Sequence, residues 1–498
     1  NEIKDKNFMI EEKEYYFACL TRLCLSILKE ADIYDSSNAF RTSKQHLWGS
    51  KERQLIWEEL VERIEQMYQE YENMPNLTQI NKTRNVIANA AKYAAISADN
   101  GIFKLELPTG SGKTKTGLRY ALANAKIYNR SRIFYITAYL SVLEQNATDI
   151  RRVVNKDKIV LEHHSNIIED SEQELEESED DDYGVRTYLI DSWENLIILT
   201  TMVQFFNTLF KEKSSNIRRF CKLINSVIII DEVQSLPIRV LSNFNLMMNF
   251  MKEIMHCNIV HCTATQPVLD SEIMRYKIYY GDNKYDNVSL INKEKIDLTC
   301  FYRVDFYNLT GKNGRILLSC EEIYTYIEKE LKTFDSCLIV MNTKSAVSDL
   351  TEFLENYLSD VEIIYLTTNL CAAHRLDVIS DMKKKLLQNR NEHKHNKIVC
   401  ISTQLIEAGV DVDFDVVFRA IAGIDSIIQC AGRCNREGKL MINDSYVHGK
   451  VCIFRYKENL SHLPDIKATA DATEYTLRKW GAIQTEDNVI NNIKELQK

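Results

Sequence analysis

From residue 101 onward, short apolar runs rich in β-branched residues alternate with longer stretches of helical character. Most of the runs hold continuous apolar stretches of about four residues instead of in–out alternation, which is typical of strands covered on both faces. Strands separated by helices predict parallel α/β sheets. The runs fall into two series, so we expect two α/β domains joined by loops and hairpins at about 275–320. The expected strands are 102–107, 132–137, 196–200, 227–230 and 258–262 in the first series, and 337–341, 362–366, 397–401, 416–420 and 451–454 in the second.

A phosphate-binding motif, LPTGSGKT, follows the first of these runs at 107–114. Gly110 and Gly112 allow backbone N–H groups to approach phosphate oxygens at the start of a helix. Lys113 is placed to reach the β and γ phosphates of ATP, and the Thr114 hydroxyl is placed to ligate Mg²⁺. A strict P-loop begins with glycine where this motif has leucine, but the two glycines nearest the phosphates are present. The predicted ATP contacts here are Gly110, Ser111, Gly112, Lys113 and Thr114.

Two carboxylates, Asp231 and Glu232, follow the 227–230 run directly. Ligands of open α/β sheets collect at this end of the strands. Asp231 suits the Mg²⁺ shell, and Glu232 suits orienting and deprotonating an attacking water. A solvated acidic turn is the alternative, and it is the weaker interpretation downstream of a P-loop.

A second phosphate-handling motif, QCAGRCNR, occupies 429–436. The spacing of Arg433 and Arg436 predicts that both guanidinium groups lie on one side of a helix. Arginine suits bidentate phosphate contact and can stabilise charge in phosphoryl transfer. Because Lys113 lies in the other half of the chain, we expect the two domains to close on one nucleotide. A solvated arginine pair is the alternative.

Composition leaves nucleic-acid binding open and gives no sign of a membrane segment. Of the net charge of −9, the block at 169–182 contributes ten acidic residues with no Lys or Arg, while the rest of the chain is nearly neutral. Such a block is typical of a solvated, mobile insertion. No apolar run approaches the roughly 20 residues of a membrane span, and the N-terminus does not resemble a secretory signal. The 13 cysteines form no CxxC pair, which favours reduced thiols in a cytoplasmic protein.

Taken together, the motifs resemble the core of the superfamily-2 helicases. The matching parts are the P-loop, a DExx box at 231–234, a coupling motif at 263–265, motif V at 402–413 and motif VI at 429–436. Other segments give a closer resemblance to the CRISPR-associated type I helicase-nucleases, which degrade foreign DNA. Those segments are 161–165, 193–195, 200–206, 338–343, 373–375 and 409–438, and they keep the family's order across most of the chain.

This resemblance implies two tandem RecA-like domains, at 71–295 and 296–460, with helical segments at 1–70 and 461–498. It implies an ATP- and Mg²⁺-dependent helicase or translocase that tracks along single-stranded DNA from 3′ to 5′ in antiviral defence. Its expected partners are a crRNA-guided type I surveillance complex and an HD nuclease in cis or in trans. By motif position, the catalytic residues are Lys113, Asp231, Glu232, Arg433 and Arg436, and further nucleotide contacts are Gln79, Gly409, Asp411 and Gln429.

The DNA contacts implied by motif position are short polar residues at predicted strand ends and helix starts. Hydroxyl and amide groups can donate to phosphate oxygens without reading sequence. Each of these residues could instead be a helix cap or a turn former. The set is Thr137, Gln145, Thr201, Gln204, Asn342, Thr343 and Thr403.

The N-terminal segment departs from the family, whose members carry an HD-type metal nuclease there. By resemblance Asp32 would complete the nuclease metal site, but His46 is the only histidine before His163. Such a site needs several imidazoles, so it cannot assemble from this chain alone, and a helix-end carboxylate is the alternative for Asp32. We expect a piece of a longer protein, a recombinant segment, or a helicase whose nuclease is encoded elsewhere; the missing initiating Met favours the first two. Tyr16, Leu20, Leu23 and Ile27 recur at helical spacing in this segment.

Two other functions share these motifs. A DEAD-like RNA helicase would carry the same core. An ATP-gated docking module that closes on nucleotide without turnover would also need the P-loop, although the intact Glu232 and both arginines argue against it.

Overall fold

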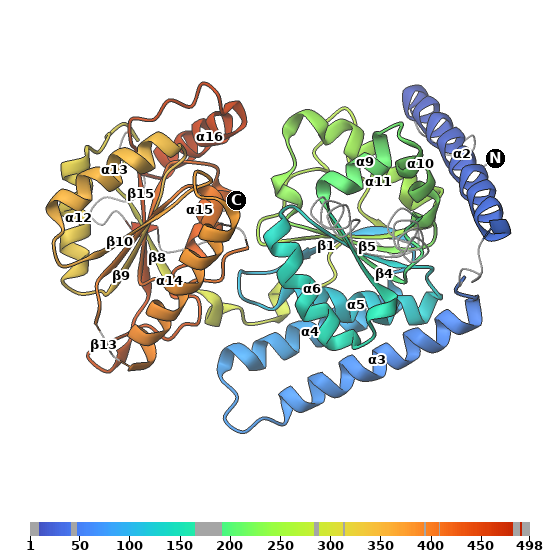
Figure 1. The fold of residues 1–498 in the computed structure, drawn as a ribbon, viewed down its shortest axis with the longest axis horizontal. Helices are drawn as coiled ribbons and strands as arrows, with labels where there is room; N and C mark the ends of the chain where they lie inside the picture. The colour runs from blue at the N-terminus through green and yellow to red at the C-terminus, as the bar shows by residue number, and fades with distance from the viewer. Residues whose placement is uncertain are drawn as a thin grey trace. The chain divides into compact units, whose positions relative to one another are not determined.

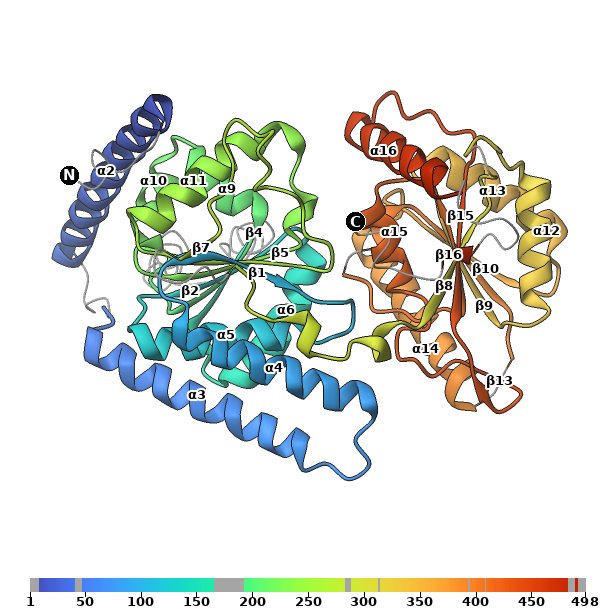
Figure 2. The same ribbon diagram turned by 180° about the vertical axis from the view of Figure 1, so that it is seen from behind.

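A computed structural model of the protein describes residues 9–40, 47–164, 192–282, 288–311, 314–392, 395–407, 409–481 and 489–490. The chain divides into two compact units, Asn1–Asp297 and Leu298–Lys498. Each unit holds a seven-stranded sheet with helices on both faces (Figures 1 and 2). The acidic block at 169–182 lies outside the described residues.

The sheet of the first unit has the order β3-β4-β2-β5-β6-β1-β7. All neighbouring strands are parallel except β7, which runs antiparallel to β1 at the edge. Its central strands are buried along their whole length, as continuous apolar runs predict. The strands are β1 (Gly101–Glu106), β2 (Ile133–Thr137), β3 (Val160–His163), β4 (Ile197–Thr201), β5 (Val227–Asp231), β6 (Asn258–Thr263) and β7 (Gly281–Asp282).

Two groups of helices cover the faces of this sheet (Figures 1 and 2). On one face, α5 and α6 contact the strands, while α3 and α4 pack against α5. On the other face, α9 and α11 contact the strands, and α2 packs against α10 and α11. The helices are α2 (Ile10–Phe40), α3 (Ser50–Glu72), α4 (Gln79–Ser97), α5 (Lys113–Tyr128), α6 (Leu140–Val154), α9 (Met202–Phe210), α10 (Ser214–Phe220) and α11 (Leu241–Glu253).

Helix α2 is confirmed as a helix, but its buried face differs from the predicted one. Tyr16 and Leu23 are buried as expected, whereas Ile27 is 47% exposed. The buried row continues instead through Ser26 and Glu30, and Glu30 forms an ion pair with a buried arginine of α10. The spacing of apolar residues did not predict this face, because about half of its buried residues are polar and one of them, Glu30, is held by an ion pair.

The second unit has the sheet order β10-β11-β9-β12-β15-β8-β16. Its strands are parallel except β16, which runs antiparallel to β8 at the edge. Helices α12 and α13 cover one face, and α14, α15 and α16 cover the other (Figure 1). The strands are β8 (Val304–Asn308), β9 (Ser336–Val340), β10 (Glu362–Leu366), β11 (Ile398–Ser402), β12 (Val416–Ala420), β15 (Gly449–Phe454) and β16 (Val489–Ile490), and β13 (Met441–Ile442) and β14 (Ser445–Tyr446) form a separate hairpin. The helices are α12 (Cys320–Leu331), α13 (Lys344–Tyr357), α14 (Ala372–Glu392), α15 (Ile424–Ala431) and α16 (Pro464–Gly481).

The prediction of two α/β domains with parallel sheets is confirmed. Six of the described strands were not predicted: β3, β7, β8, β13, β14 and β16. Of these, β7 and β8 lie in the region expected to hold loops and hairpins, and β16 lies where a helical segment was expected. In β8 only Phe306 is buried, so this strand lacks a continuous apolar run. None of the helices in the described ranges combines the length and apolar character that crossing a membrane requires.

Candidate active site

In the first unit, the predicted nucleotide and DNA residues collect at the carboxyl edge of the sheet. Strand register brings the ends of β1 and β6 together, because Glu106 pairs with Thr263. The ends of β2 and β4 lie side by side in the same way, with Thr137 paired to Thr201. Asp231, the last residue of β5, lies between them in the strand order. The parallel strands therefore bring the carboxyl ends of β1, β2, β4, β5 and β6 to one edge of the sheet, where such sheets bind ligands.

The P-loop connects β1 to α5 with two glycines in the left-handed region. Gly110 has φ 79° and Gly112 has φ 84°, and α5 begins at Lys113 directly afterwards. A Cβ built on Gly112 would meet no atom within 4 Å. This open space beside the N-terminus of a four-turn helix suits a phosphate, because the helix presents N–H groups and a positive dipole end there.

The Lys113 ammonium points at the acidic pair. Its Nζ lies 2.9 Å from Glu232 Oε1. Burial alone would lower the pKa of Lys113, but the charges of Glu232 and Asp231 outweigh burial and raise it. Burial and the neighbouring Glu232 charge raise the pKa of Asp231 to about 6. One cation and two carboxylates therefore share a small, mostly buried volume.

Glu232 itself has a left-handed backbone, with φ 55°. This conformation costs roughly 1–3 kcal/mol for a residue other than glycine, and it persists where the surroundings hold it. Glu232 N donates to Cys262 O at 2.9 Å and to Asp231 Oδ1 at 3.1 Å. The Gln234 amide donates to Glu232, and the Thr263 hydroxyl donates to Gln234. The DExx box and the motif at 263–265 are thus joined by side-chain hydrogen bonds.

Three residues that the sequence did not single out support this site. The Arg84 guanidinium donates to Gly110 O at 2.6 and 2.9 Å, which braces the P-loop from α4. The Thr114 hydroxyl donates to Asn146 Oδ1 at 2.9 Å, and the Tyr135 hydroxyl lies 3.4 Å from Asp231 Oδ2. No local motif marks these partners, because each comes from a different element.

The remaining predicted residues of the first unit differ in exposure. Thr137 is buried and donates to Tyr139 O, while Thr201 caps α9 by accepting from Gln204 N. Gln145 on α6 and Gln79, the first residue of α4, are exposed. Thr201 is therefore a helix cap as well as a candidate for DNA contact.

In the second unit, motifs V and VI contact each other. Arg433 Nη2 donates to Glu407 O at 2.6 Å and Nε donates to Ile406 O at 3.1 Å. Arg436 Nη1 lies 2.6 Å from Asp411 Oδ1. Gly409, with φ 74°, lies in the same motif V loop, and Gln429 is half-buried on α15.

The prediction that Arg433 and Arg436 share a helix is wrong. Helix α15 ends at Ala431, and the chain then turns. The backbone of Cys434 pairs with that of Phe414 in an isolated β-bridge, and Asn435 has a left-handed backbone with φ 43°. Pairing with the motif V strand segment overrides helical continuation, so the two guanidinium groups reach motif V from a turn.

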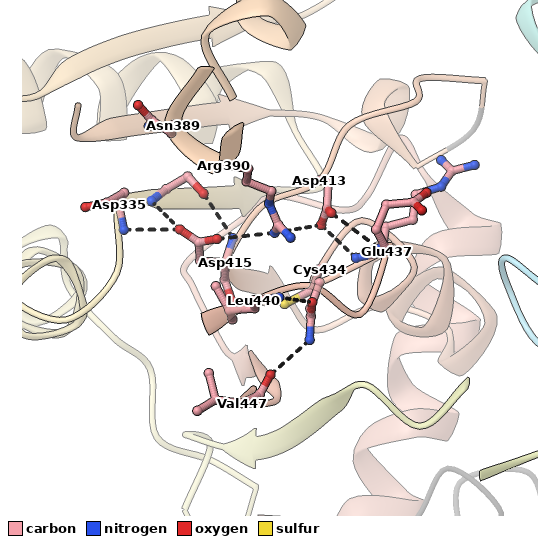
Figure 3. A network of polar contacts seen from close by, with 12 residues as sticks. Asp335, Asn389, Arg390, Asp413, Asp415, Cys434, Glu437, Leu440 and Val447 are labelled. Carbon is pink, nitrogen blue, oxygen red and sulfur yellow. Dashed lines mark hydrogen bonds and ion pairs between the residues drawn. The ribbon is translucent and has the colours of Figure 1, made fainter. Parts of the chain in front are cut away.

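A buried charge network holds this turn from behind (Figure 3). Asp413 Oδ1 accepts from Arg436 N at 2.6 Å, and Arg390 Nη2 from α14 lies 3.0 Å from the same oxygen. Arg390 Nη2 also lies 3.3 Å from Asp415 Oδ1. Burial raises the pKa of Asp413 and of Asp415, and Arg390 opposes this. Figure 3 shows Arg390 between the two carboxylates.

The predicted DNA residues of the second unit follow β9 and β11. Asn342 is buried, and its Nδ2 donates to Ile421 O at 3.0 Å and to Glu458 Oε2 at 2.7 Å. The Glu458 carboxylate also accepts from Asn342 N and Thr343 N, at the N-terminus of α13. Thr343 caps α13, and Thr403 is half-buried after β11. The Glu458 carboxylate thus accepts from the Asn342 side-chain amide, one of the groups expected to contact phosphate, and from two neighbouring backbone N–H groups.

Asp32, the residue proposed as a remnant nuclease ligand, is exposed on α2. Within the described ranges, no three His, Cys, Asp or Glu side chains gather in a way that could hold a metal.

Two family profiles match the chain. The family described as CRISPR-associated nuclease/helicase Cas3, C-terminal, matches residues 334–439, and the family described as Type III restriction enzyme, res subunit, matches residues 58–267. Among curated proteins, the CRISPR-associated nuclease/helicase Cas3 of Haloferax volcanii is 23% identical over 482 residues, which covers 79% of this chain and 50% of the relative.

Solved structures share the fold. The crystal structure of T. fusca Cas3 with AMPPNP has a TM-score of 0.63 at 14% identity, covering 86% of this chain and 52% of that one. A chain of a CRISPR RNA-guided surveillance complex, pre-nicking, has a TM-score of 0.56 at 14% identity, covering 83% and 50%. The chain spans about half the length of the relatives that it matches. In sequence, the chain is thus similar to Cas3 helicases over its second unit and to a restriction-enzyme subunit over its first, and it shares its fold with solved Cas3 structures.

Proposed function

We propose that the protein is an Mg²⁺-dependent ATPase that translocates along single-stranded DNA in CRISPR type I interference. The observation that carries the proposal is the P-loop with its open phosphate space, facing the Lys113–Glu232 ion pair and Asp231. An ammonium and two carboxylates beside a helix N-terminus form a donor set that suits a triphosphate and a hard divalent cation.

The chemistry follows from the competition for Lys113. A phosphate at the α5 N-terminus attracts the ammonium away from Glu232, which leaves that carboxylate free to orient and deprotonate a water. Asp231 and the Thr114 hydroxyl would hold Mg²⁺, which supplies charge neutralisation at the transferring phosphoryl group. The bond from Gln234 keeps Glu232 oriented after Lys113 leaves. We assign Arg433 and Arg436 to stabilising the charge that develops during hydrolysis.

Three substitutions test these roles. Lys113→Ala should lower ATP turnover by at least about 100-fold, because it removes the phosphate-facing cation. Glu232→Gln should bind ATP normally but lose about 100-fold or more in turnover, since the general base is gone. Lys115→Ala, on the same helix but directed at Tyr71, is the matched control and should stay near wild type. Wild-type turnover in either active-site variant would disprove the assignment.

We further propose that DNA passes along the carboxyl edges of both sheets, contacted mainly through its backbone, with movement from 3′ to 5′. The support is the row of hydroxyl, amide and backbone donors at the ends of β2, β4, β9 and β11. Strand displacement on duplexes with a 3′ or a 5′ tail tests the direction. Unwinding of only the 5′-tailed duplex would contradict it.

We propose a crRNA-guided surveillance complex and an HD nuclease as partners, and action in the cytoplasm. The support is the fold shared with a chain of a CRISPR RNA-guided surveillance complex. All thirteen cysteines are unpaired thiols, which fits a reducing compartment. We expect an immobilised surveillance complex that has bound DNA to retain the protein. The RNA of that complex alone should not retain it.

A further inference from the structure

A buried polar cluster in the second unit connects the predicted DNA residues to motif V. Its centre is Arg419 on β12, which is fully buried. Arg419 Nη1 donates to Asn342 Oδ1 at 2.8 Å, and Nη2 donates to Ser426 Oγ at 2.8 Å. Nε lies 2.8 Å from Glu407 Oε1. One rigid guanidinium plane therefore contacts three other elements at once.

One end of the cluster lies at the DNA side. Asn342 follows β9 and precedes the α13 cap, and its Oδ1 is held by Arg419 while its Nδ2 faces Glu458. Glu458 also accepts from the backbone N–H groups of Asn342 and Thr343. A DNA phosphate that binds these donors has to replace the Glu458 carboxylate. The Asn342 amide then donates to a phosphate instead of to Glu458, while its oxygen still accepts from Arg419.

The other end lies at motif VI. The Glu407 carboxylate contacts Arg419 and accepts from the Ser426 hydroxyl and, at 3.3 Å, from the Cys430 thiol. The Glu407 backbone oxygen accepts from Arg433 Nη2. The side chain of Glu407 therefore fixes the peptide that holds Arg433.

Structural need alone does not explain this cluster. A buried ion pair loses solvation that its attraction only partly recovers, and well-packed apolar residues usually stabilise a core as well or better. The surrounding residues on both faces of the sheet are apolar. A polar network enclosed in such a core has few alternative arrangements, so a change in geometry at one end alters the geometry at the other.

We propose that Arg419 is a positioning residue that couples DNA binding at Asn342 and Thr343 to the placement of Arg433, acting through Glu407 and Ser426. The proposal rests on the proposed function of these sites. Arg419 is fully buried, so it acts through its neighbours and not by contact with nucleotide or DNA. When the Asn342 amide shifts, the planar guanidinium group of Arg419 moves with it and displaces the Glu407 carboxylate. The Glu407 backbone oxygen, which accepts from Arg433, then repositions the Arg433 guanidinium group.

Two variants test the coupling. Ser426→Ala removes the hydroxyl that bridges Arg419 and Glu407 with little change in volume. Arg419→Lys keeps the charge, but a single ammonium cannot span Asn342, Ser426 and Glu407 together. Thr473→Ala is the matched control, because this buried hydroxyl on α16 of the same unit donates to Thr469 O, outside the cluster. For each protein, ATP turnover is measured without DNA and with saturating single-stranded DNA, together with the DNA dissociation constant and thermal unfolding.

We expect stimulation by DNA, the ratio of the DNA-saturated to the DNA-free turnover, to fall about 5-fold or more in Ser426→Ala and in Arg419→Lys, a usual size for coupling between sites. Thr473→Ala should keep the stimulation of the wild type. Equal stimulation in wild type and Ser426→Ala would overturn the proposal, and so would a proportional loss of basal and stimulated rates in all three variants. If Arg419→Lys fails to fold, Ser426→Ala decides. Absence of DNA stimulation in the wild type would instead refute the proposed function.

Discussion

Replacing Arg390 by Met should destabilise the second unit strongly. Arg390 Nη2 is shared by Asp413 and Asp415, at 3.0 and 3.3 Å, and its side chain is only 18% exposed. Removing one partner of a buried ion pair costs about 3–5 kcal/mol, because the remaining charge stays desolvated. Both carboxylates keep backbone N–H donors, so we expect the lower end, about 3 kcal/mol.

The loss should depend on pH with a definite sign. Burial already raises the pKa of Asp413 and Asp415 above the unfolded value, and Arg390 opposes that rise. Without Arg390 the folded-state pKa values rise further, so the folded variant binds more protons than its unfolded state. Its deficit relative to wild type should therefore shrink as the pH falls from 7.5 to 5.5.

Urea titration followed by hydrogen exchange in β9 and β12 isolates the second unit, since the two units need not unfold together. The exposed Lys384 lies on the same helix, and Lys384→Met is the control for loss of a positive charge. A loss below about 1 kcal/mol, the level of a surface pair, would refute the reasoning. If the loss of unfolding free energy in Arg390→Met grew toward pH 5.5, the unpaired charges of Asp413 and Asp415 would not be its cause.

Two further predictions concern the first unit. Burial, and then the Lys104 charge, lower the pKa of His261 to about 3; because the unfolded imidazole titrates near 6.5, stability should fall by about 1.4 kcal/mol from pH 7.5 to 5.5. His261→Leu should flatten that pH slope, and an unchanged slope in denaturation curves would contradict the assignment. In Gly112→Ala the added methyl group contacts no neighbour, but alanine has to adopt the unfavourable φ of 84°. The free energy of unfolding should therefore fall by about 1 kcal/mol. The added methyl group enters the phosphate space, so ATP affinity measured by calorimetry should fall about 10-fold or more; equal affinity would place the phosphate elsewhere.

Local sequence was sufficient where one segment carries the whole signal. The strand at 227–230 is a continuous apolar run, and the acidic pair follows it directly in the sequence. The P-loop is likewise a contiguous segment after a strand. Strand β8, next to the edge strand β16, buries only Phe306 and therefore has no apolar run to recognise. Helix α2 hides its face because Glu30 is buried against Arg218.

The supporting residues could not be predicted, because their roles come from long-range contacts. Arg84 and Gly110 meet only when α4 packs beside α5. Arg419 lies outside every motif, and only folding brings it against the Glu407 carboxylate of motif V in the core of the second unit. The turn after α15 was also beyond local reasoning, since the pairing of Cys434 with Phe414 decides it.

ATP turnover by the wild-type protein in the presence of single-stranded DNA, and of RNA of the same sequence, tests the central claim most directly. The account predicts stimulation by DNA that Glu232→Gln abolishes while ATP binding persists. Stimulation by RNA alone, or no turnover at saturating DNA, would contradict it.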